Sequence, residues 1–240
     1  MKKNIKIFNI SFIDSDFKNI KLLLDNGGLL VLPSGPGLAT IKNDFRYYKA
    51  LRNADLALFD SGYFCLLLRL FKNIKVKKFS GYKFIKKFIK SFDRKKQKKI
   101  YLIEPSINHS IINREYLKRK KINNINQYIA PIYKKNKITD IKLLKDIKTI
   151  KPKYIIINLG GGTQEILGSY LKKNLNYKPS IICSGAAISF LTKQQAPISP
   201  IVDKLYLSWL LRIIYNPILF LPRYLSAFKL LFLVWNEKIK

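Results

Sequence analysis

The 240-residue chain is poor in the residue types that build metal sites, disulfide frameworks and serine hydrolases. It has two cysteines and one histidine. Cys65 and Cys183 lie inside apolar segments without zinc-ligand spacing, so we interpret them as small buried hydrophobes in a reducing compartment. His109 has no acid pair near it, and Ser34, Ser61 and Ser184 have no histidine placed to activate them. We therefore expect neither a metal or other cofactor nor a Ser-His-acid hydrolase.

Long hydrophobic runs are also missing. The first 17 residues interleave Lys6, Asn9 and Asp14 with apolar residues, which does not match the continuous core of a signal peptide. The longest charge-free run near the C-terminus is Ile213–Pro222, well short of the roughly 20 apolar residues that a spanning helix needs. The sequence therefore predicts a cytoplasmic protein that can lie on a bilayer without crossing it.

Acidic residues are few, 14 against 46 Lys and Arg, which leaves a formal charge of +32. Because lysine, isoleucine and asparagine are all abundant, a bias typical of AT-rich genomes, we give this charge little weight as a sign of nucleic-acid binding. A nucleic-acid-binding protein remains the weakest alternative, and no recognition motif supports it. The hydrophobic share of 48% excludes a disordered polyelectrolyte. We expect an anionic partner, either a phosphate, a nucleotide or a lipid headgroup.

Short apolar runs alternate with amphipathic stretches along most of the chain. This alternation predicts an α/β fold with a largely parallel sheet flanked by helices. The predicted strands are Ile5–Ile10, Leu29–Leu32, Leu56–Phe59, Ile100–Ile103, Tyr154–Leu159 and Ser180–Cys183. The predicted helices are Ile41–Asn53, Gly62–Phe71, Tyr82–Ser91, Asn108–Lys120, Thr139–Ile150 and Thr163–Asn174.

The last 36 residues differ in composition from the rest of the chain, with eight large aromatic residues set among Arg212, Arg223 and Lys229. We therefore predict a domain over residues 1–204 and a basic, aromatic helical appendage over residues 205–240. Such an appendage either rests on an anionic bilayer surface or packs on the core or on another subunit of a homo-oligomer. The sequence leaves these alternatives open.

Small residues follow four of the predicted strands. These strand ends carry Ser34-Gly35, Asp60-Ser61-Gly62, Gly160-Gly161-Gly162 and Ser184-Gly185. Ligands of a parallel sheet bind beyond the carboxyl ends of its strands, and glycine turns that open helices expose N–H groups that favour phosphate. Since no Walker lysine and no spaced dinucleotide fingerprint are present, we predict a nucleotide or sugar-phosphate site formed by Ser34, Gly35, Gly160, Gly161 and Gly185.

Three polar side chains at these strand ends are candidates for chemistry. Asp60, which follows a buried strand, is either a general base or a cap for the helix that begins near Gly62. Gln164 and Glu165 open a helix directly after the glycine triplet. They either hydrogen-bond a ribose or base, or Glu165 serves only as an acid favoured by the helix dipole.

Several of these motifs together resemble the WecG/TagA/CpsF glycosyltransferases, over about Leu29–Leu225. The motifs that carry the resemblance are Asn53-Ala54-Asp55-Leu56 before Asp60-Ser61-Gly62, Gly160–Glu165, Ala196-Pro197, Leu207–Arg212 and Asn216-Pro217. The resemblance implies a Rossmann-like, metal-independent, inverting enzyme. It implies transfer of an N-acetylmannosamine-like sugar from a UDP donor to a polyprenyl-diphosphate-linked saccharide, in cell-surface polysaccharide synthesis on the inner face of the membrane.

The resemblance also implies roles for individual residues. Asp60 matches the proposed general base, and Gln164 and Glu165 match an element implicated in nucleotide-sugar binding. Arg212 and Arg223 of the basic appendage would reach a diphosphate, whose charge must be met by cations and N–H groups when no metal is present.

Departures from the family pattern fall inside the predicted site. Leu32-Pro33-Ser34 replaces Thr-x-Asn, and Lys78 replaces an arginine, which keeps the charge and loses bidentate geometry. Other departures are Lys83 for an acid, Gly162-Thr163 for Pro-Lys, Gln195 for an arginine and Ser208 for a glutamate. Either the enzyme acts on a different sugar or acceptor, with a donor pocket rebuilt around Ser34, Gly35 and Lys78, or it binds nucleotide sugars without catalysis. We favour the active enzyme because Asp60, Gln164 and Glu165 remain.

Overall fold

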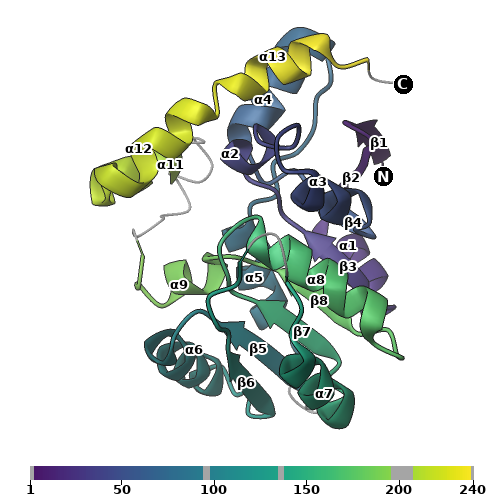
Figure 1. The fold of residues 1–240 in the computed structure, drawn as a ribbon, viewed down its shortest axis with the longest axis vertical. Coiled ribbons are helices and arrows are strands. Elements are labelled where there is room, and N and C mark those ends of the chain that lie inside the picture. Colours follow the sequence, from purple (N-terminus) through teal and green to yellow (C-terminus); the bar gives the residue numbers. More distant parts are fainter. Residues whose placement is uncertain (1–2, 94–97, 135–137, 196–207, 239–240) are drawn as a thin grey trace.

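The structure is a computed structural model that describes residues 3–93, 98–134, 138–195 and 208–238. Its centre is an eight-stranded sheet in the order β1-β2-β4-β3-β8-β7-β5-β6. β1 pairs with β2 in antiparallel fashion, and every other pairing is parallel. The predicted α/β class with a largely parallel sheet is confirmed (Figure 1).

The elements follow one another along the chain with helices between most of the strands. The strands are β1 Lys3–Ile7, β2 Ile10–Asp14, β3 Gly28–Val31, β4 Leu56–Leu58, β5 Ile100–Glu104, β6 Ile125–Ile129, β7 Tyr154–Ile157 and β8 Ser180–Cys183. The described helices are α1 Phe17–Asp25, α2 Gly35–Leu38, α3 Phe45–Arg52, α4 Gly62–Lys72, α5 Gly81–Lys90, α6 Ile107–Arg119, α7 Ile141–Ile150, α8 Thr163–Asn174, α9 Ala187–Leu191, α11 Ser208–Tyr215, α12 Pro217–Ser226 and α13 Lys229–Asn236.

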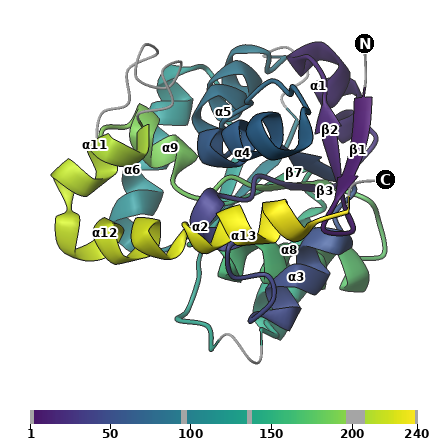
Figure 2. The ribbon, with the colours of Figure 1, turned by 90° about the horizontal axis from the view of Figure 1, so that it is seen from above.

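Helices cover both faces of the sheet because the parallel strands are apolar on both sides. In β3, Leu29 and Val31 face one core and Leu30 faces the other. The first core also takes side chains from α3, α4, α7, α8 and α13, and the second takes them from α1, α5, α6 and α9. Figure 2 shows the two helical layers on either side of the sheet.

The N-terminal prediction was wrong in detail. Ile5–Ile10 is not one strand, because Phe8 and Asn9 both have positive φ and form a tight turn between β1 and β2. Positive φ at both central residues suits the twist of a two-residue hairpin. The predictions also missed α1 and β6, and Ile41–Asn53 is helical only as α3.

Parallel pairing brings three loops to one edge of the sheet. β4, β3 and β8 are neighbours, so the residues after their carboxyl ends, Asp60, Ser34 and Ser184, lie close together. Gly160 follows β7, which is one strand further from β3 and β4. This order predicts that Asp60 and Ser34 share a site from which the Gly160 turn is displaced.

The C-terminal helices differ in how they pack. α13 joins the first core through Leu230 and Val234, which are fully buried, and each such burial stabilises the docked helix by about 1.5–3 kcal/mol. Glu237 then accepts a hydrogen bond from the Phe8 amide at 2.7 Å. By contrast, α12 has no buried residue. For α13, the structure shows packing on the core, which is one of the alternatives predicted for the appendage.

One helical stretch in the described chain, Pro217–Asn236, is long and apolar enough to cross a membrane by length and composition alone. This stretch comprises α12 and α13. It is longer than the charge-free run Ile213–Pro222 because it includes Arg223 and Lys229. Part of this stretch is α13, which packs on the core through Leu230 and Val234.

The turn before β3 provides a test of this fold. Gly27 has φ +82°, and a Cβ there would lie 2.1 Å from the Lys178 carbonyl oxygen. We predict that Gly27→Ala lowers the free energy of unfolding by about 2 kcal/mol or more, as measured by urea denaturation. Gly161→Ala is the control, because a Cβ there meets nothing within 4 Å and should change stability by less than about 0.5 kcal/mol. Equal effects would contradict the described backbone.

Candidate active site

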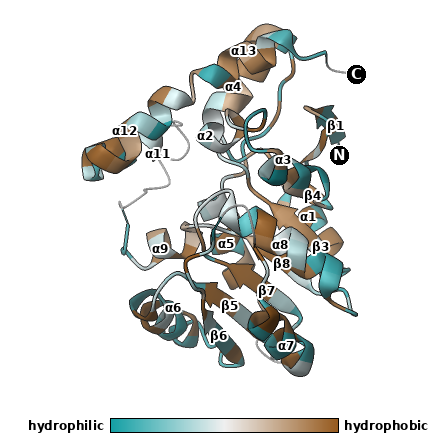
Figure 3. Cartoon of the chain, viewed as in Figure 1, coloured by the Kyte–Doolittle hydropathy of each residue, from teal (hydrophilic) through white to brown (hydrophobic). Residues whose placement is uncertain are grey.

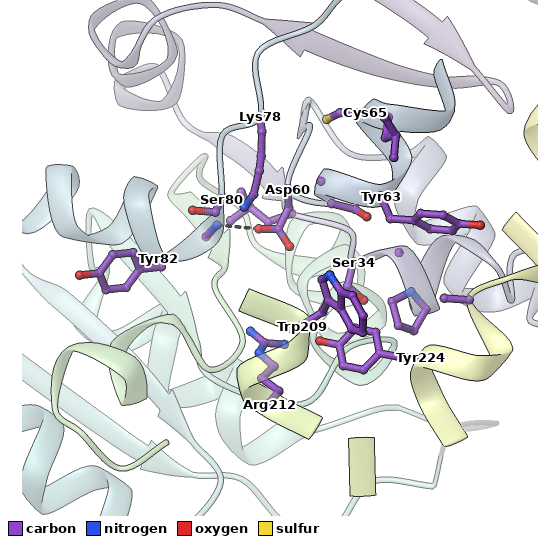
Figure 4. A pocket seen from close by; sticks show the side chains of 18 of the residues that line it. Ser34, Asp60, Tyr63, Cys65, Lys78, Ser80, Tyr82, Trp209, Arg212 and Tyr224 are labelled. Atoms are coloured by element: carbon purple, nitrogen blue, oxygen red, sulfur yellow. Dashed lines mark hydrogen bonds between the residues drawn. The ribbon is translucent and has the colours of Figure 1, made fainter. Parts of the chain in front are cut away.

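A cavity of about 790 Å³ opens at the carboxyl ends of β4, β3 and β8. Its lining comes from the loops after these strands, from the start of α5 and from side chains of α4, α11 and α12 (Figure 4). The polar lining residues include Ser34, Asp60, Ser61, Lys78, Ser80, Tyr82, Ser184 and Arg212. The apolar lining residues include Leu66, Val76, Phe190, Trp209, Ile213, Leu221, Leu225 and Phe228.

Asp60 is the one carboxylate among the described residues that line this cavity. It is half-buried, and its Oδ1 accepts a hydrogen bond from the Gly81 amide, the first residue of α5, at 2.7 Å. Asp60 does not cap α4, because Ser61 does so by accepting from the Phe64 amide at 3.2 Å. The alternative of a cap for the helix near Gly62 is therefore wrong, and the carboxylate is held at the cavity wall by α5.

Ser34 and Gly35 bring the loop after β3 against the loop after β4. Ser34 caps α2 by accepting from the Gly37 amide at 3.3 Å, and it lines the cavity. A Cβ on Gly35 would lie 2.8 Å from the Ser61 Oγ. A glycine at this position is therefore what allows the two loops to approach each other beside Asp60.

Among the described residues, four cationic side chains line the cavity: Arg69, Lys75, Lys78 and Arg212. The Arg212 guanidinium lies 4.6 Å from the centre of the Phe190 ring, and its Nε is buried without a hydrogen-bond partner. Stacking holds the planar group in place while it leaves N–H donors for a ligand. The cavity thus combines one carboxylate with several cations, a pattern suited to a substrate that carries phosphate.

Arg223 lies outside the main cavity. It borders a neighbouring pocket of about 20 Å³ that it shares with Ser34, Arg212 and Tyr224. The structure therefore brings Ser34, Gly35, Asp60, Lys78 and Arg212 together in one cavity and places Arg223 beside it.

The glycine triplet and its two polar neighbours do not line the cavity. Gly160 and Gly161 form an exposed turn, and no side chain or backbone atom would meet a Cβ on either residue within 4 Å. The Gln164 Oε1 accepts from the Gly185 amide at 2.7 Å, and its Nε2 donates to Glu165. These side chains therefore link the loops after β7 and β8, and their predicted contact with the donor stays a prediction.

Glu165 is only 1% exposed and accepts from the Gly162 amide at 2.7 Å. Burial raises the pKa of its carboxyl to about 7, although the hydrogen bonds from Gly162 and Gln164 act to lower it. Glu165 therefore accepts a backbone hydrogen bond in the first turn of α8, and its contact with a nucleotide sugar stays a prediction.

A buried polar network supports the loop after β8 from below. Glu104, at the end of β5, accepts from the amide groups of Asn113 and Asn158, and Ser184 donates to the Asn158 Oδ1 at 2.7 Å. Burial raises the pKa of Glu104. Because Ser184 also lines the cavity, this network positions a wall of the site.

Sequence reasoning missed several lining residues. Ser80, Tyr82 and Tyr63 were not singled out, and the Tyr63 hydroxyl is buried without a hydrogen-bond partner. The one usable signal was Ser80-Gly81, a serine cap directly before an amphipathic helix. Trp209 and Tyr224 could not be placed, since only the packing of the last helices brings them to the strand ends.

Two motif positions lie outside the residues that the structure describes: Ala196-Pro197 and Leu207. Gln195 is described, is half-buried and is not among the lining residues. Within the described ranges, no cluster of three or more His, Cys, Asp or Glu side chains could hold a metal ion.

Comparison with known proteins gives one result. The model of the glycosyl transferase WecG/TagA/CpsF family matches residues 4–240, essentially the whole chain. No curated protein matches the chain.

The raised pKa of Glu165 predicts how stability depends on pH. Between the ordinary carboxyl pKa near 4.5 and the folded value of about 7, the unfolded chain loses this proton while the folded chain keeps it. Glu165 therefore lowers the stability of the fold progressively as the pH rises through this range, by about 3 kcal/mol in total.

Glu165→Gln keeps the packing and cannot ionise. Relative to the wild type, we expect its free energy of unfolding to rise by about 3 kcal/mol between pH 4.5 and pH 8, measured by urea denaturation at several pH values. Glu115→Gln on α6 is the control. A constant difference between the variant and the wild type at all pH values would show that Glu165 titrates normally.

Proposed function

Because the chain belongs to the WecG/TagA/CpsF family of glycosyltransferases, we propose that it moves a sugar from a UDP donor to a polyprenyl-diphosphate-linked saccharide. The observation that carries this proposal is the position of Asp60, the one described carboxylate in a large cavity that also contains Arg69, Lys75, Lys78 and Arg212. The donor sugar is proposed to be N-acetylmannosamine-like, in keeping with the family resemblance, and the product is a precursor of a cell-surface polysaccharide.

In the proposed reaction, the Asp60 carboxylate accepts the proton of the acceptor hydroxyl while that oxygen attacks the anomeric carbon. The bond from the anomeric carbon to the donor diphosphate breaks on the opposite face, so UDP leaves and the configuration inverts. The Gly81 amide holds Asp60 Oδ1 at 2.7 Å, which fixes the direction of the carboxylate before the substrates bind. A positioned base of this kind contributes typically 10²–10⁴-fold to a rate.

Charge on the departing UDP is met in this proposal by side chains and amides. Lys78 lines the cavity together with Asp60, and Ser34 and Ser80 add hydroxyl groups to the lining. Cations and fixed N–H donors in a site that excludes water stabilise a developing phosphate charge more strongly than they would in water. If the nucleotide extends beyond the cavity toward β7, the donor site also includes the exposed glycine turn, Gln164, Glu165 and Gly185.

Arg212 is proposed to bind the acceptor diphosphate, with Arg223 beside it at the outer end of the site. Both residues belong to the proposed appendage, residues 205–240, which follows a catalytic domain over residues 1–204. The exposed apolar residues of α12 support a peripheral location on the inner face of the cell membrane, because Ile218, Leu219 and Leu221 have no partner within the described chain that buries them.

The central test is Asp60→Asn. The asparagine oxygen can still accept from the Gly81 amide, so we expect an unchanged fold but UDP release at least about 100-fold slower. UDP release is measured with a panel of UDP-sugars and a lipid-diphosphate acceptor, and donor binding by the rise in melting temperature. Asp16→Asn, which retains a helix cap on α1, is the control.

The outcomes separate the two interpretations of the site. Wild-type UDP release by Asp60→Asn would refute the role of Asp60 as the base. If a UDP-sugar raises the melting temperature of the wild type but no donor gives UDP release, the protein is a nucleotide-sugar-binding homologue without catalysis.

Arg212→Lys tests the acceptor site. The lysine keeps the charge but loses the planar group that stacks on Phe190 and its paired donors. We expect the KM for the lipid-diphosphate acceptor to rise about tenfold, with little change in the melting-temperature shift caused by the donor. Arg46→Lys, on the exposed surface of α3, should leave both values unchanged. An unchanged KM in Arg212→Lys would remove Arg212 from the acceptor site.

A further inference from the structure

Helices α4 and α13 lie side by side and run in the same direction at one end of the molecule (Figures 1 and 2). Near their starts, the Tyr63 and Phe228 rings are 6.3 Å apart, and near their ends the Phe71 and Trp235 rings are 5.0 Å apart. The Lys72 Nζ also donates to the Trp235 carbonyl at 2.9 Å. The C-terminal helix is therefore fixed against a helix that lies more than 150 residues earlier in the chain.

The outward side of this helix pair is apolar. We define the α4–α13 strip as Leu66 and Leu70 of α4 together with Phe232 and Trp235 of α13 and Phe228 directly before it. These five large side chains are between 51% and 67% exposed, although other residues of both helices are buried in the core. Figure 3 shows the hydrophobic colouring of both helices at this end of the molecule. A cluster of exposed apolar side chains of this size marks an interaction surface.

The charged residues of the two segments that contain the strip, 61–92 and 204–236, are all cationic. No acidic residue occurs between Asp60 and Asp93, and none occurs between Asp203 and Glu237. The cations of these segments include Arg69, Lys72, Lys75 and Lys229. Apolar side chains bordered by lysine and arginine fit the interface of a bilayer with anionic headgroups. A second copy of the chain fits less well, because an interface between identical strips would bring like charges together.

The strip borders the mouth of the cavity. Leu66 and Phe228 belong to the strip and also line the cavity, and so do the neighbouring cations Arg69 and Lys75. A surface in contact with the strip would therefore also face the opening that leads to Asp60.

We infer that the α4–α13 strip docks on an anionic lipid bilayer, so that α4 of the main domain shares the membrane contact with the C-terminal helices. The cavity then opens at the headgroup layer. If the proposed acceptor is correct, its diphosphate lies at the same level and can enter without extraction of the lipid chain. Docking itself does not depend on the proposed reaction.

A fluorescent label at position 70 tests this contact directly. Leu70 is exposed and is not among the residues that line the cavity. In Leu70→Cys the new thiol is accessible, while Cys65 and Cys183 are buried and burial raises the pKa of Cys65 to about 12. An environment-sensitive maleimide or iodoacetamide dye at neutral pH should therefore react at position 70. Phe232→Cys reports on the C-terminal helix in the same way, and Leu22→Cys, at an equally exposed position of α1, is the matched control.

Full-length labelled proteins are mixed with vesicles of phosphatidylcholine and phosphatidylglycerol. We expect the emission at positions 70 and 232 to shift to the blue and to rise about twofold or more, with no change at position 22. Vesicles of phosphatidylcholine alone, or high salt, should weaken the response. The inference would be overturned by a change in emission at position 232 with none at position 70, or by no change at either position. A signal at position 70 that grows with protein concentration in the absence of vesicles would assign the strip to self-association and overturn it too.

Leu70→Glu provides a second measurement without a label. A carboxylate in the strip should lower vesicle partitioning about tenfold in co-sedimentation, whereas Leu22→Glu should leave it unchanged. Equal partitioning of the two variants would contradict docking through α4. Neither vesicle experiment contains a sugar donor or acceptor. The vesicle experiments therefore test docking alone, and the UDP-release assay tests the proposed transferase activity alone.

Discussion

The parallel pairing of β4, β3 and β8 is the constraint on which the rest of the site depends. Because parallel strands end at the same edge of the sheet, the residues that follow these three strands meet there, and they include Asp60, Ser34 and Ser184. The close approach at Gly35 and the hydrogen bond from the Gly81 amide to Asp60 then set the distances between the loops. A different strand order would separate Asp60 from Ser34 and Ser184.

Three carboxylates near the strand ends, Asp60, Glu104 and Glu165, lie in two different environments. Glu104 and Glu165 are buried behind the loops, accept several hydrogen bonds and hold strand ends in place. Asp60 lies at the cavity wall among cations. The buried pair holds the loops beside the cavity that Asp60 lines, and burial raises the pKa of both buried groups.

The C-terminal helices link the site to the surface of the molecule. α11 and α12 supply Trp209, Arg212 and Tyr224 to the cavity, while α13 is held on the core by Leu230, Val234 and the Glu237 hydrogen bond to Phe8. Since α13 also packs along α4, the cavity mouth and the exposed apolar strip belong to one structural unit. The docking that we infer and the entrance to the cavity therefore involve the same helices.

The amino-acid sequence by itself determined the α/β class, most of the strands, the loops of small residues after them, and the family, because hydrophobic periodicity and short motifs are local properties. It could not decide which side chains share a cavity. Gln164 and Glu165 follow a strand end, as Asp60 does, and were predicted to bind the nucleotide sugar, yet their side chains bond to the Gly185 and Gly162 amides and to each other. It also could not show that α13 packs beside α4, or that Ile5–Ile10 turns at Phe8. Only the tertiary structure decided these points, since they depend on strand order and on contacts between segments far apart in the chain, for which local patterns carry no signal.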